Sequence, residues 1–185
     1  MIEQRKEKFG LNPKQLGLKL GLFGGEAGLQ NPSFRQKIEE EWGIDAIDAN
    51  YGMADVMSIF ASENRLTKDG LTFWGKDFLK AQLLIDHHLV DIKKGLQGEL
   101  VLSTLYNGGL ICRKDYRTGD VIEVLSDDEN FRFQILGRAD EMLVVRGINV
   151  YPSTLLDVAT KAMNEFGKDF FWQLFVSKEL MENKK

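Results

Sequence analysis

The segment 131–145 carries the clearest hydrophobic pattern of the chain. Phe131, Phe133 and Ile135 alternate with polar residues, and this alternation is typical of a strand with one buried face. The apolar run Met142–Val145 predicts a second strand. Ala139-Asp140 therefore forms a joint between two elements. A polar dipeptide in such a place is commonly a hairpin turn, and the pattern alone leaves that interpretation open.

The first third of the chain has the pattern of a βαβ unit. Leu18–Phe23 predicts a mostly buried strand, Ser33–Trp42 a helix with one apolar stripe, and Ile44–Ala49 a second strand. If the two strands are parallel, the loops Gly24-Gly25-Glu26 and Tyr51-Gly52 follow the carboxyl ends of neighbouring strands. Open α/β sheets bind ligands at that edge.

Residues 71–128 change to strand-like periodicity, with turn signals about every 8 to 12 residues. Leu100–Leu105 is the clearest strand in this region, and Val121–Leu125 is another. The segment Tyr116–Asp120, just before the latter, has the composition of a charged turn. The pattern predicts a small antiparallel sheet or distorted barrel. With the βαβ corner, the fold class is mixed α/β.

The pattern after the joint predicts a helix and then a strand. An apolar stripe with helical spacing runs from Leu155 to Phe166, with Ser153 as its N-cap and Gly167 as its stop. Phe170–Val176 then alternates as a strand before a charged tail. Because an unpaired apolar strand tends to pair with another chain, we expect self-association through this segment.

The composition is that of an ordinary globular protein. Of the 185 residues, 28% are charged and 43% hydrophobic, which argues against disorder. The net charge of -4 comes from mixed acidic and basic residues, which argues against nucleic acid or an anionic membrane as the main partner. The single cysteine, Cys112, has no internal disulfide partner, and no apolar run approaches bilayer length. Met1–Phe9 is charged rather than apolar, so a cytoplasmic location is expected.

Five short motifs occur in an order that is typical of one enzyme family. They are Leu22–Glu26, Tyr51–Asp55, Gly98–Val101, Tyr116–Asp120 and the stretch GRADEMLVVRGINVYPS from Gly137 to Ser153. Together they resemble the adenylate-forming acyl-CoA synthetases and ligases, and the last is most similar to the phenylacetate-CoA ligase branch. An ordered set of motifs is far more specific than any one of them.

The resemblance implies an adenine site in the first part of the chain. The family's Gly-Ala-Glu loop corresponds to Gly24-Gly25-Glu26, against which the adenine would lie, and the Tyr51 ring of the Tyr51-Gly52 pair would pack near it. Asp55 stands where the family has a glutamate that holds magnesium on the phosphates. Its arm is one methylene shorter. Since magnesium demands strict octahedral geometry, the shorter arm favours coordination through water or none.

The resemblance also assigns roles around the joint. Asp120 would accept hydrogen bonds from both ribose hydroxyls, and a carboxylate with two oxygens suits a vicinal diol. Arg138 is the better-placed partner for Asp120 or for the nucleotide, with Arg117 as the other candidate. Asp140 would be the hinge about which the family's small domain rotates between adenylation and thioester formation.

Two parts that the family uses for catalysis have no match here. Nothing before Leu18 resembles the phosphate loop, and the terminal lysines Lys184 and Lys185 do not fit the catalytic lysine. The chain is thus expected to be a middle-to-late piece of a longer ligase. Residues 1–139 would be the last portion of the large AMP-binding domain, and residues 140–185 the hinge and a truncated start of the small domain.

The parent reaction implied by the resemblance uses ATP, magnesium, coenzyme A and a small carboxylic acid, with an aryl acid such as phenylacetate as the usual class. This polypeptide alone is expected to keep the adenosine contacts without making an acyl adenylate. Two alternatives stay open at this point. One is a non-catalytic nucleotide-binding or interaction module, and the other is an adenylate-forming enzyme with an acceptor other than coenzyme A.

Overall fold

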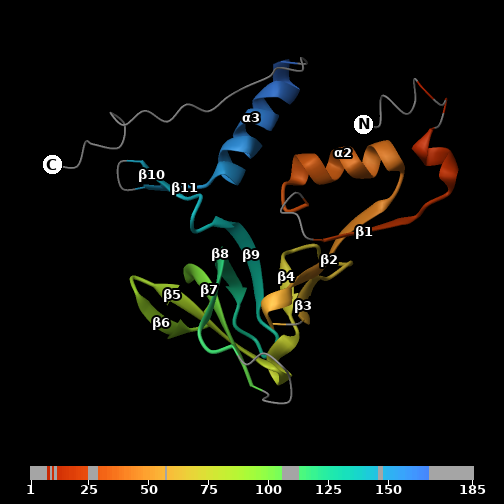
Figure 1. The fold of residues 1–185 in the computed structure, drawn as a ribbon. Helices are drawn as coiled ribbons and strands as arrows, with labels where there is room; N and C mark the ends of the chain where they lie inside the picture. The colour runs from red at the N-terminus through yellow and green to blue at the C-terminus, as the bar shows by residue number, and fades with distance from the viewer. Residues whose placement is uncertain are drawn as a thin grey trace.

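The computed structural model describes residues 8, 10, 12–24, 29–56, 58–105, 113–145 and 148–166. Within them the strands form a nine-stranded mixed sheet, ordered β1-β2-β3-β4-β9-β8-β7-β5-β6, and a separate pair β10-β11 (Figure 1). The predicted mixed α/β class is confirmed. The strands are β1 (Leu20–Gly24), β2 (Asp45–Met53), β3 (Ser58–Glu63), β4 (Leu71–Phe73), β5 (Leu79–Ile85), β6 (His88–Asp91), β7 (Gln97–Thr104), β8 (Tyr116–Ser126), β9 (Arg132–Arg138), β10 (Leu143–Val145) and β11 (Ile148–Val150). The helices are α2 (Pro32–Trp42), α3 (Pro152–Phe166) and the short 3-10 turns η1 (Pro13–Leu16), η2 (Ala54–Val56) and η3 (Gly75–Asp77).

The β1-α2-β2 corner is the predicted βαβ unit, with β1 and β2 parallel. The prediction that β1 is mostly buried is wrong, since Leu20 and Leu22 are 41% and 66% exposed at the edge of the sheet. The ends of α2 follow from local chemistry. The Asn31 side chain accepts a hydrogen bond from the Phe34 backbone N–H at 3.1 Å, and Pro32 occupies the first turn. The helix stops at Gly43, whose positive φ of 67° suits glycine.

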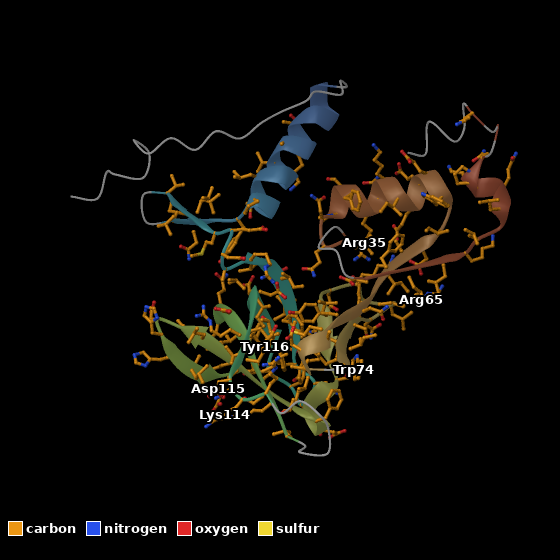
Figure 2. All side chains as sticks on the ribbon, in the orientation of Figure 1. Arg35, Arg65, Trp74, Lys114, Asp115 and Tyr116 are labelled. Carbon is orange, nitrogen blue, oxygen red and sulfur yellow. The ribbon has the colours of Figure 1, made fainter. Side chains whose placement is uncertain are left out.

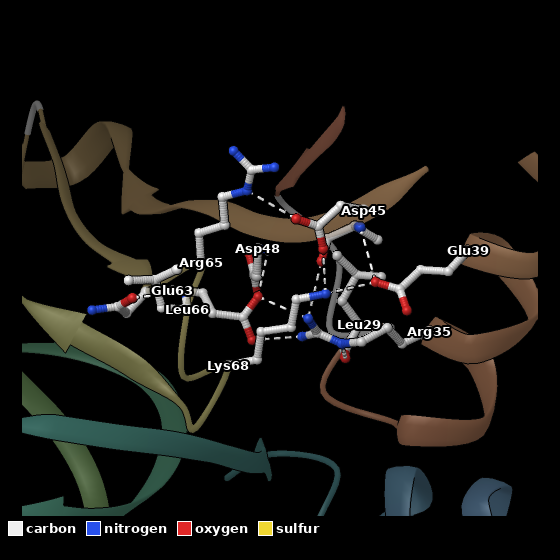
Figure 3. Close-up of polar contacts among 11 residues, drawn as sticks. Leu29, Arg35, Glu39, Asp45, Asp48, Glu63, Arg65, Leu66 and Lys68 are labelled. Carbon is white, nitrogen blue, oxygen red and sulfur yellow. Dashed lines mark hydrogen bonds and ion pairs between the residues drawn. The ribbon is translucent and has the colours of Figure 1, made fainter. Parts of the chain in front are cut away.

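A cluster of charged side chains joins this corner to β3 and the turn after it (Figure 3). Arg35 on α2 forms a two-pronged ion pair with Glu63, with N–O distances of 2.6 and 2.9 Å. Arg35 also donates to the carbonyl of Ala46 at 3.0 Å. Lys68 lies between Glu39 at 2.7 Å and Asp45 at 2.5 Å. The corner is therefore attached largely through directional polar contacts.

Strand β2 is longer than its pattern predicts. The predicted strand ends at Ala49 and leaves Tyr51-Gly52 on a loop, whereas both residues lie inside β2. The reason is a second partner, because the last residues of β2 pair antiparallel with β3, with Tyr51 opposite Ala61. A Cβ on Gly52 would collide with the β3 backbone. The absence of a side chain at Gly52 therefore permits this close approach.

The antiparallel part of the sheet encloses the apolar core, as the pattern of residues 71–128 predicts. Phe60 and Phe133 are both 0% exposed. The Tyr51 ring meets each of them edge-on, with centroids 5.1 and 5.5 Å apart. Phe73 stacks on Phe131 at 4.8 Å. The alternation of Phe131 and Phe133 with polar neighbours thus corresponds to one buried face of this sheet.

The predicted charged turn Tyr116–Asp120 is instead the first half of β8. Its backbone pairs with β7 on one side, with Leu102 opposite Tyr116. On the other side Asp120 lies opposite Arg138 of β9. Gly119 has a φ of 78°, which accounts for the turn-like composition within a strand. The turn prediction was wrong because the long-range pairing overrides the local preference.

The joint after β9 connects two sheets. Ala139-Asp140 lies in a turn, but β10 pairs with β11 and not with β9. The hairpin interpretation is therefore wrong. Helix α3 begins at Pro152, close to its predicted start. Gly167, the predicted strand Phe170–Val176 and the self-association expected from it lie outside the described residues.

Of the two α-helices in the described part of the chain, neither has the length and apolar character needed to cross a bilayer.

Candidate functional site

A cleft of about 610 Å³ lies where the end of β2, the start of β8, the end of β9 and the start of α3 meet. Four of the predicted site residues line it: Tyr51, Gly52, Asp120 and Arg138. They come from three strands that are distant in the sequence. The structure therefore brings the ribose candidate, its arginine and the Tyr51-Gly52 pair to one surface.

Asp120 lies at the centre of the cleft wall and is held from two sides. Its Oδ2 accepts a hydrogen bond from the Tyr51 hydroxyl at 2.7 Å, and its Oδ1 accepts one from Arg138 Nη1 at 3.0 Å. Its side chain is only 14% exposed. Burial first, and then the charge and hydrogen bond of Asp120, raise the pKa of Tyr51 well above its usual value. Tyr51 therefore stays a neutral donor to a fixed carboxylate.

Arg138 connects Asp120 to the predicted hinge residue. Besides Asp120, it contacts Asp140 Oδ1 at 3.3 Å and donates to the carbonyl of Thr118 at 3.1 Å. Desolvation works against its charge, but the contacts with Asp120 and Asp140 raise the pKa of Arg138 overall. A Cβ on Gly119 would collide with its guanidinium. Gly119 therefore leaves the space that Arg138 fills.

The other predicted residues stand apart from this centre. Arg117 donates to Glu99 through Nε at 3.0 Å and does not contact Asp120 among its described bonds. Gly24 pairs with Asn50 of β2, and a Cβ at Gly24 would collide with Asn50. Asn50 lines the cleft, so Gly24 lies behind the cleft wall. Gly25 and Glu26 lie outside the described residues.

Asp55 lies on η2 and already has partners. Arg113 Nη2 is 3.4 Å from its Oδ1. A hydrogen bond to Asp55 is the largest of the causes that raise the pKa of Tyr116, followed by burial and the charge of Asp55. The described residues contain no group of three or more His, Cys, Asp or Glu placed to hold a metal ion. A single short carboxylate that pairs with a guanidinium does not fit a magnesium site.

Asp48, which lines the cleft near Asn50, was not among the predicted site residues. It is only 6% exposed. Burial, and secondarily the charge of Glu63, raises its pKa from 3.8 to about 6, although Gln30 and Arg35 partly offset this. An aspartate within an apolar strand is the signal that could have identified it.

Comparisons with known proteins show which class of enzyme this chain resembles. No protein-family profile matches the chain. The phenylacetate-coenzyme A ligase of Aromatoleum evansii is 34% identical over 160 residues, which is 84% of this chain and 35% of that relative. The phenylacetate-coenzyme A ligase of Escherichia coli K12 is 33% identical over 165 residues, covering 87% of this chain and 37% of the relative. The chain thus spans about one third of the length of the relatives that it matches.

Solved structures agree with these relatives. A crystal structure of 2-hydroxyisobutyryl-CoA ligase in the postadenylation state, in complex with 2-HIB-AMP, superimposes with a TM-score of 0.73 at 27% identity. The match covers 86% of this chain and 34% of that one. The anthranilate CoA ligase AuaEII, in complex with anthranoyl-AMP, matches with a TM-score of 0.52 over 75% of this chain and 28% of its own. At 22% identity, that second likeness concerns the fold alone.

These relatives and solved structures are adenylate-forming CoA ligases, and the chain shares their fold. More particularly, the chain is a partial homologue of the phenylacetate-CoA ligases, which confirms the resemblance that its motifs indicated. The relatives do not favour a non-catalytic module or an acceptor other than coenzyme A.

Proposed function

We propose that this chain forms the adenosine-binding part of an ATP-dependent, AMP-forming carboxylic acid CoA ligase. The observation that carries the proposal is the Asp120 carboxylate, fixed by Tyr51 and Arg138 in the wall of a cleft of about 610 Å³. An aryl acid such as phenylacetate is the proposed substrate class of the parent enzyme. This part of the proposal follows the named relatives.

The hydrogen-bonding capacity of Asp120 suits a ribose diol. An ionised carboxylate offers about four lone-pair positions on its two oxygens. Tyr51 uses one position on Oδ2 and Arg138 uses one on Oδ1. One position on each oxygen stays available, which matches two adjacent hydroxyls. Because its partners already restrain the carboxylate, binding the diol costs little further side-chain entropy.

The contact between Arg138 and Asp140 supports a role for the joint as a hinge. Arg138 contacts the Asp120 carboxylate on one side and Asp140 on the other. We propose residues 1–139 as the end of the large domain and residues 140–185 as the hinge and the start of the small domain. In the parent enzyme, a rotation at Asp140 would exchange the contacts of Arg138 while Asp120 keeps its place on β8.

The proposed ligands are AMP for this chain, and ATP and coenzyme A for the parent. The complexes of 2-hydroxyisobutyryl-CoA ligase with 2-HIB-AMP and CoA support this choice. Magnesium at Asp55 was a prediction from the resemblance, and the pairing of Asp55 with Arg113 does not support it. The cytoplasmic location stays a prediction.

Calorimetric titration with AMP tests the proposal. The Asp120→Asn variant keeps the shape of the side chain but leaves one oxygen, so we expect a loss of affinity of about tenfold or more. Asp127→Asn is the matched control, because Asp127 is exposed at a turn. If the native chain binds no AMP, the proposal fails.

A second measurement addresses catalysis by the chain alone. We expect no exchange of pyrophosphate into ATP above background with phenylacetate or other aryl acids. The reason is that the proposed site supplies contacts to adenosine, while nothing before Leu18 resembles the family's phosphate loop. Exchange above background would contradict this part of the proposal.

A further inference from the structure

Asp55 does not offer a free carboxylate to the cleft. Its Oδ1 lies 3.4 Å from Nη2 of Arg113, and its charge and hydrogen bond act on the Tyr116 hydroxyl. Tyr116 lines the cleft, so the pair of Asp55 and Arg113 lies just beyond its edge. A ligand at this edge of the cleft would therefore meet the Arg113 guanidinium as well as the Asp55 carboxylate.

Hydrogen bonds to Thr104 fix the main chain of Arg113, and its guanidinium has N–H donors that Asp55 does not use. The Thr104 N–H donates to the Arg113 carbonyl at 2.8 Å, and the Arg113 N–H donates to Thr104 Oγ1 at 3.0 Å. The guanidinium carbon lies 5.8 Å from the centroid of the Tyr116 ring. Tyr116 marks the start of β8, next to Lys114 and Asp115 (Figure 2). The position of Arg113 relative to the cleft is therefore defined by β7 and β8.

The bond between Arg113 and Asp55 is weak enough to be exchanged. The two side chains are 44% and 45% exposed, and exposed ion pairs contribute only about 0–1 kcal/mol. A guanidinium has five N–H donors in a planar fork that matches the oxygens of a phosphate. Arg113 can thus bind a phosphate with its remaining donors at small cost.

The two ends of the cleft differ in charge. The end near Asn50 contains the buried Asp48, with Glu63 and its ion-pair partner Arg35 next to it. Two guanidinium groups, those of Arg113 and Arg138, lie around Tyr116. Asp55 pairs with the first, and Asp120 and Asp140 pair with the second. The donors of these guanidinium groups that the carboxylates do not use attract a phosphate, whereas the Asp48 carboxylate repels it. A nucleotide whose ribose lies on Asp120 would therefore direct its phosphate toward Tyr116.

We propose that Arg113 is a phosphate-binding residue at the edge of this cleft, and that it supplies the positive charge for a nucleoside monophosphate without a metal ion on Asp55. This inference rests on the proposed adenosine site, which it extends to the phosphate. The donor set supports it, since Asp55 pairs with Arg113 and a lone short carboxylate does not fit magnesium.

The test compares AMP with adenosine in calorimetric titrations of the native chain and of two variants. In Arg113→Ala we expect the affinity for AMP to fall about tenfold or more, because a charge-assisted hydrogen bond is lost, and the affinity for adenosine to stay the same. Lys114→Ala removes a neighbouring exposed lysine and is the matched control, with a change of less than about twofold. A thermal unfolding curve of each variant verifies that it is folded.

The same titrations with magnesium and with EDTA examine the metal. We expect equal AMP affinity in both, and a modest gain in Asp55→Asn because Arg113 loses its competing carboxylate. The inference is overturned if magnesium raises AMP affinity and Asp55→Asn abolishes that gain. It is also overturned if Arg113→Ala binds AMP as well as the native chain does. If the native chain binds neither AMP nor adenosine, the proposed adenosine site itself is wrong. If it binds both and only the Arg113→Ala result is negative, the role of Arg113 alone is wrong.

Discussion

The two halves of the nine-stranded sheet are held together by different forces. In the antiparallel half, aromatic and aliphatic side chains such as Phe60, Phe133 and Leu83 are 0% exposed and pack against one another. In the β1-α2-β2 corner, α2 has no buried residue. The corner buries only Leu29, Ala46 and Ile47 among its described apolar residues. It is joined to β3 by Arg35 and Glu63, whose side chains are 13% and 4% exposed, and by their charged neighbours (Figure 3).

This difference explains the arrangement of the cleft. Apolar burial supplies most of the stability of a domain, whereas buried ion pairs mainly fix geometry and contribute little net free energy. Tyr51 and Asp120 belong to the well-packed half, so the proposed ribose site has a rigid base. Asp48 and Asn50 come from the part of β2 that faces the corner. The more weakly held side therefore supplies one wall of the cleft.

The largest expected loss of stability comes from a substitution in the antiparallel, apolar half of the sheet. Phe133→Ala removes a fully buried ring that contacts Tyr51 and Phe131, and we expect the free energy of unfolding to fall by about 4 kcal/mol. Urea unfolding followed by circular dichroism measures it. Phe34→Ala, at a position that is 46% exposed on α2, is the matched control and should cost below about 1 kcal/mol. Similar losses for both variants would contradict the contrast between the halves.

The second largest loss of stability is expected from a substitution in the β1-α2-β2 corner. Arg35→Ala leaves the Glu63 carboxylate buried without its ion pair, and the expected loss is about 3 kcal/mol. The same urea unfolding measures it. A loss below about 1 kcal/mol would show that the cluster contributes to geometry alone.

A third variant should stabilise the chain. The pKa of Asp48 is raised from 3.8 to about 6, so the folded state holds the proton more tightly than the unfolded state. Well below pH 3.8 the carboxyl is protonated in both states, and stability falls as the pH rises from there to about 6. Asp48→Asn should therefore raise the free energy of unfolding at pH 7 by about 2 kcal/mol. If Asp48→Asn raised the free energy of unfolding by the same amount at pH 3.5, the ionisation of Asp48 would not be the cause of the gain.

The smallest effect is expected at the exposed rim of the cluster. Arg65 contacts Asp45 at 2.9 Å, with side chains 61% and 31% exposed. Arg65→Ala should cost below about 0.5 kcal/mol, and the cost should vanish at high salt. Thermal unfolding at low and high salt measures it. A cost equal to that of Arg35→Ala would mean that burial does not separate the two arginines.

Local pattern was enough to predict much of this fold. The βαβ corner, the buried face that carries Phe131 and Phe133, and the helix after Tyr151 follow from periodicity and turn chemistry. The extension of β2 through Tyr51 could not be predicted, because it depends on pairing with β3. For the same reason the pattern predicted a turn at Tyr116–Asp120, where β7 and β9 make a strand.

The sequence predicted several residues of the candidate site but few of the contacts between them. Motifs identified Asp120 and Arg138, which lie together in the cleft. The pairing of Arg113 with Asp55 joins residues that are distant in the sequence, so no local spacing signals it. The burial of Asp48 likewise depends on packing against other elements. Contacts of this kind are determined by tertiary structure.

The two ends of β2 pair with different strands. Its first residues pair with β1, and Tyr51–Met53 pair with β3 in the apolar half. If the corner opens first, the backbone amides of β2 near Asp45 exchange with solvent while those near Tyr51 stay protected. Amide hydrogen exchange along this one strand would then step from fast to slow beside the proposed ribose site. Substrate binding could be followed there without any label on the ligand.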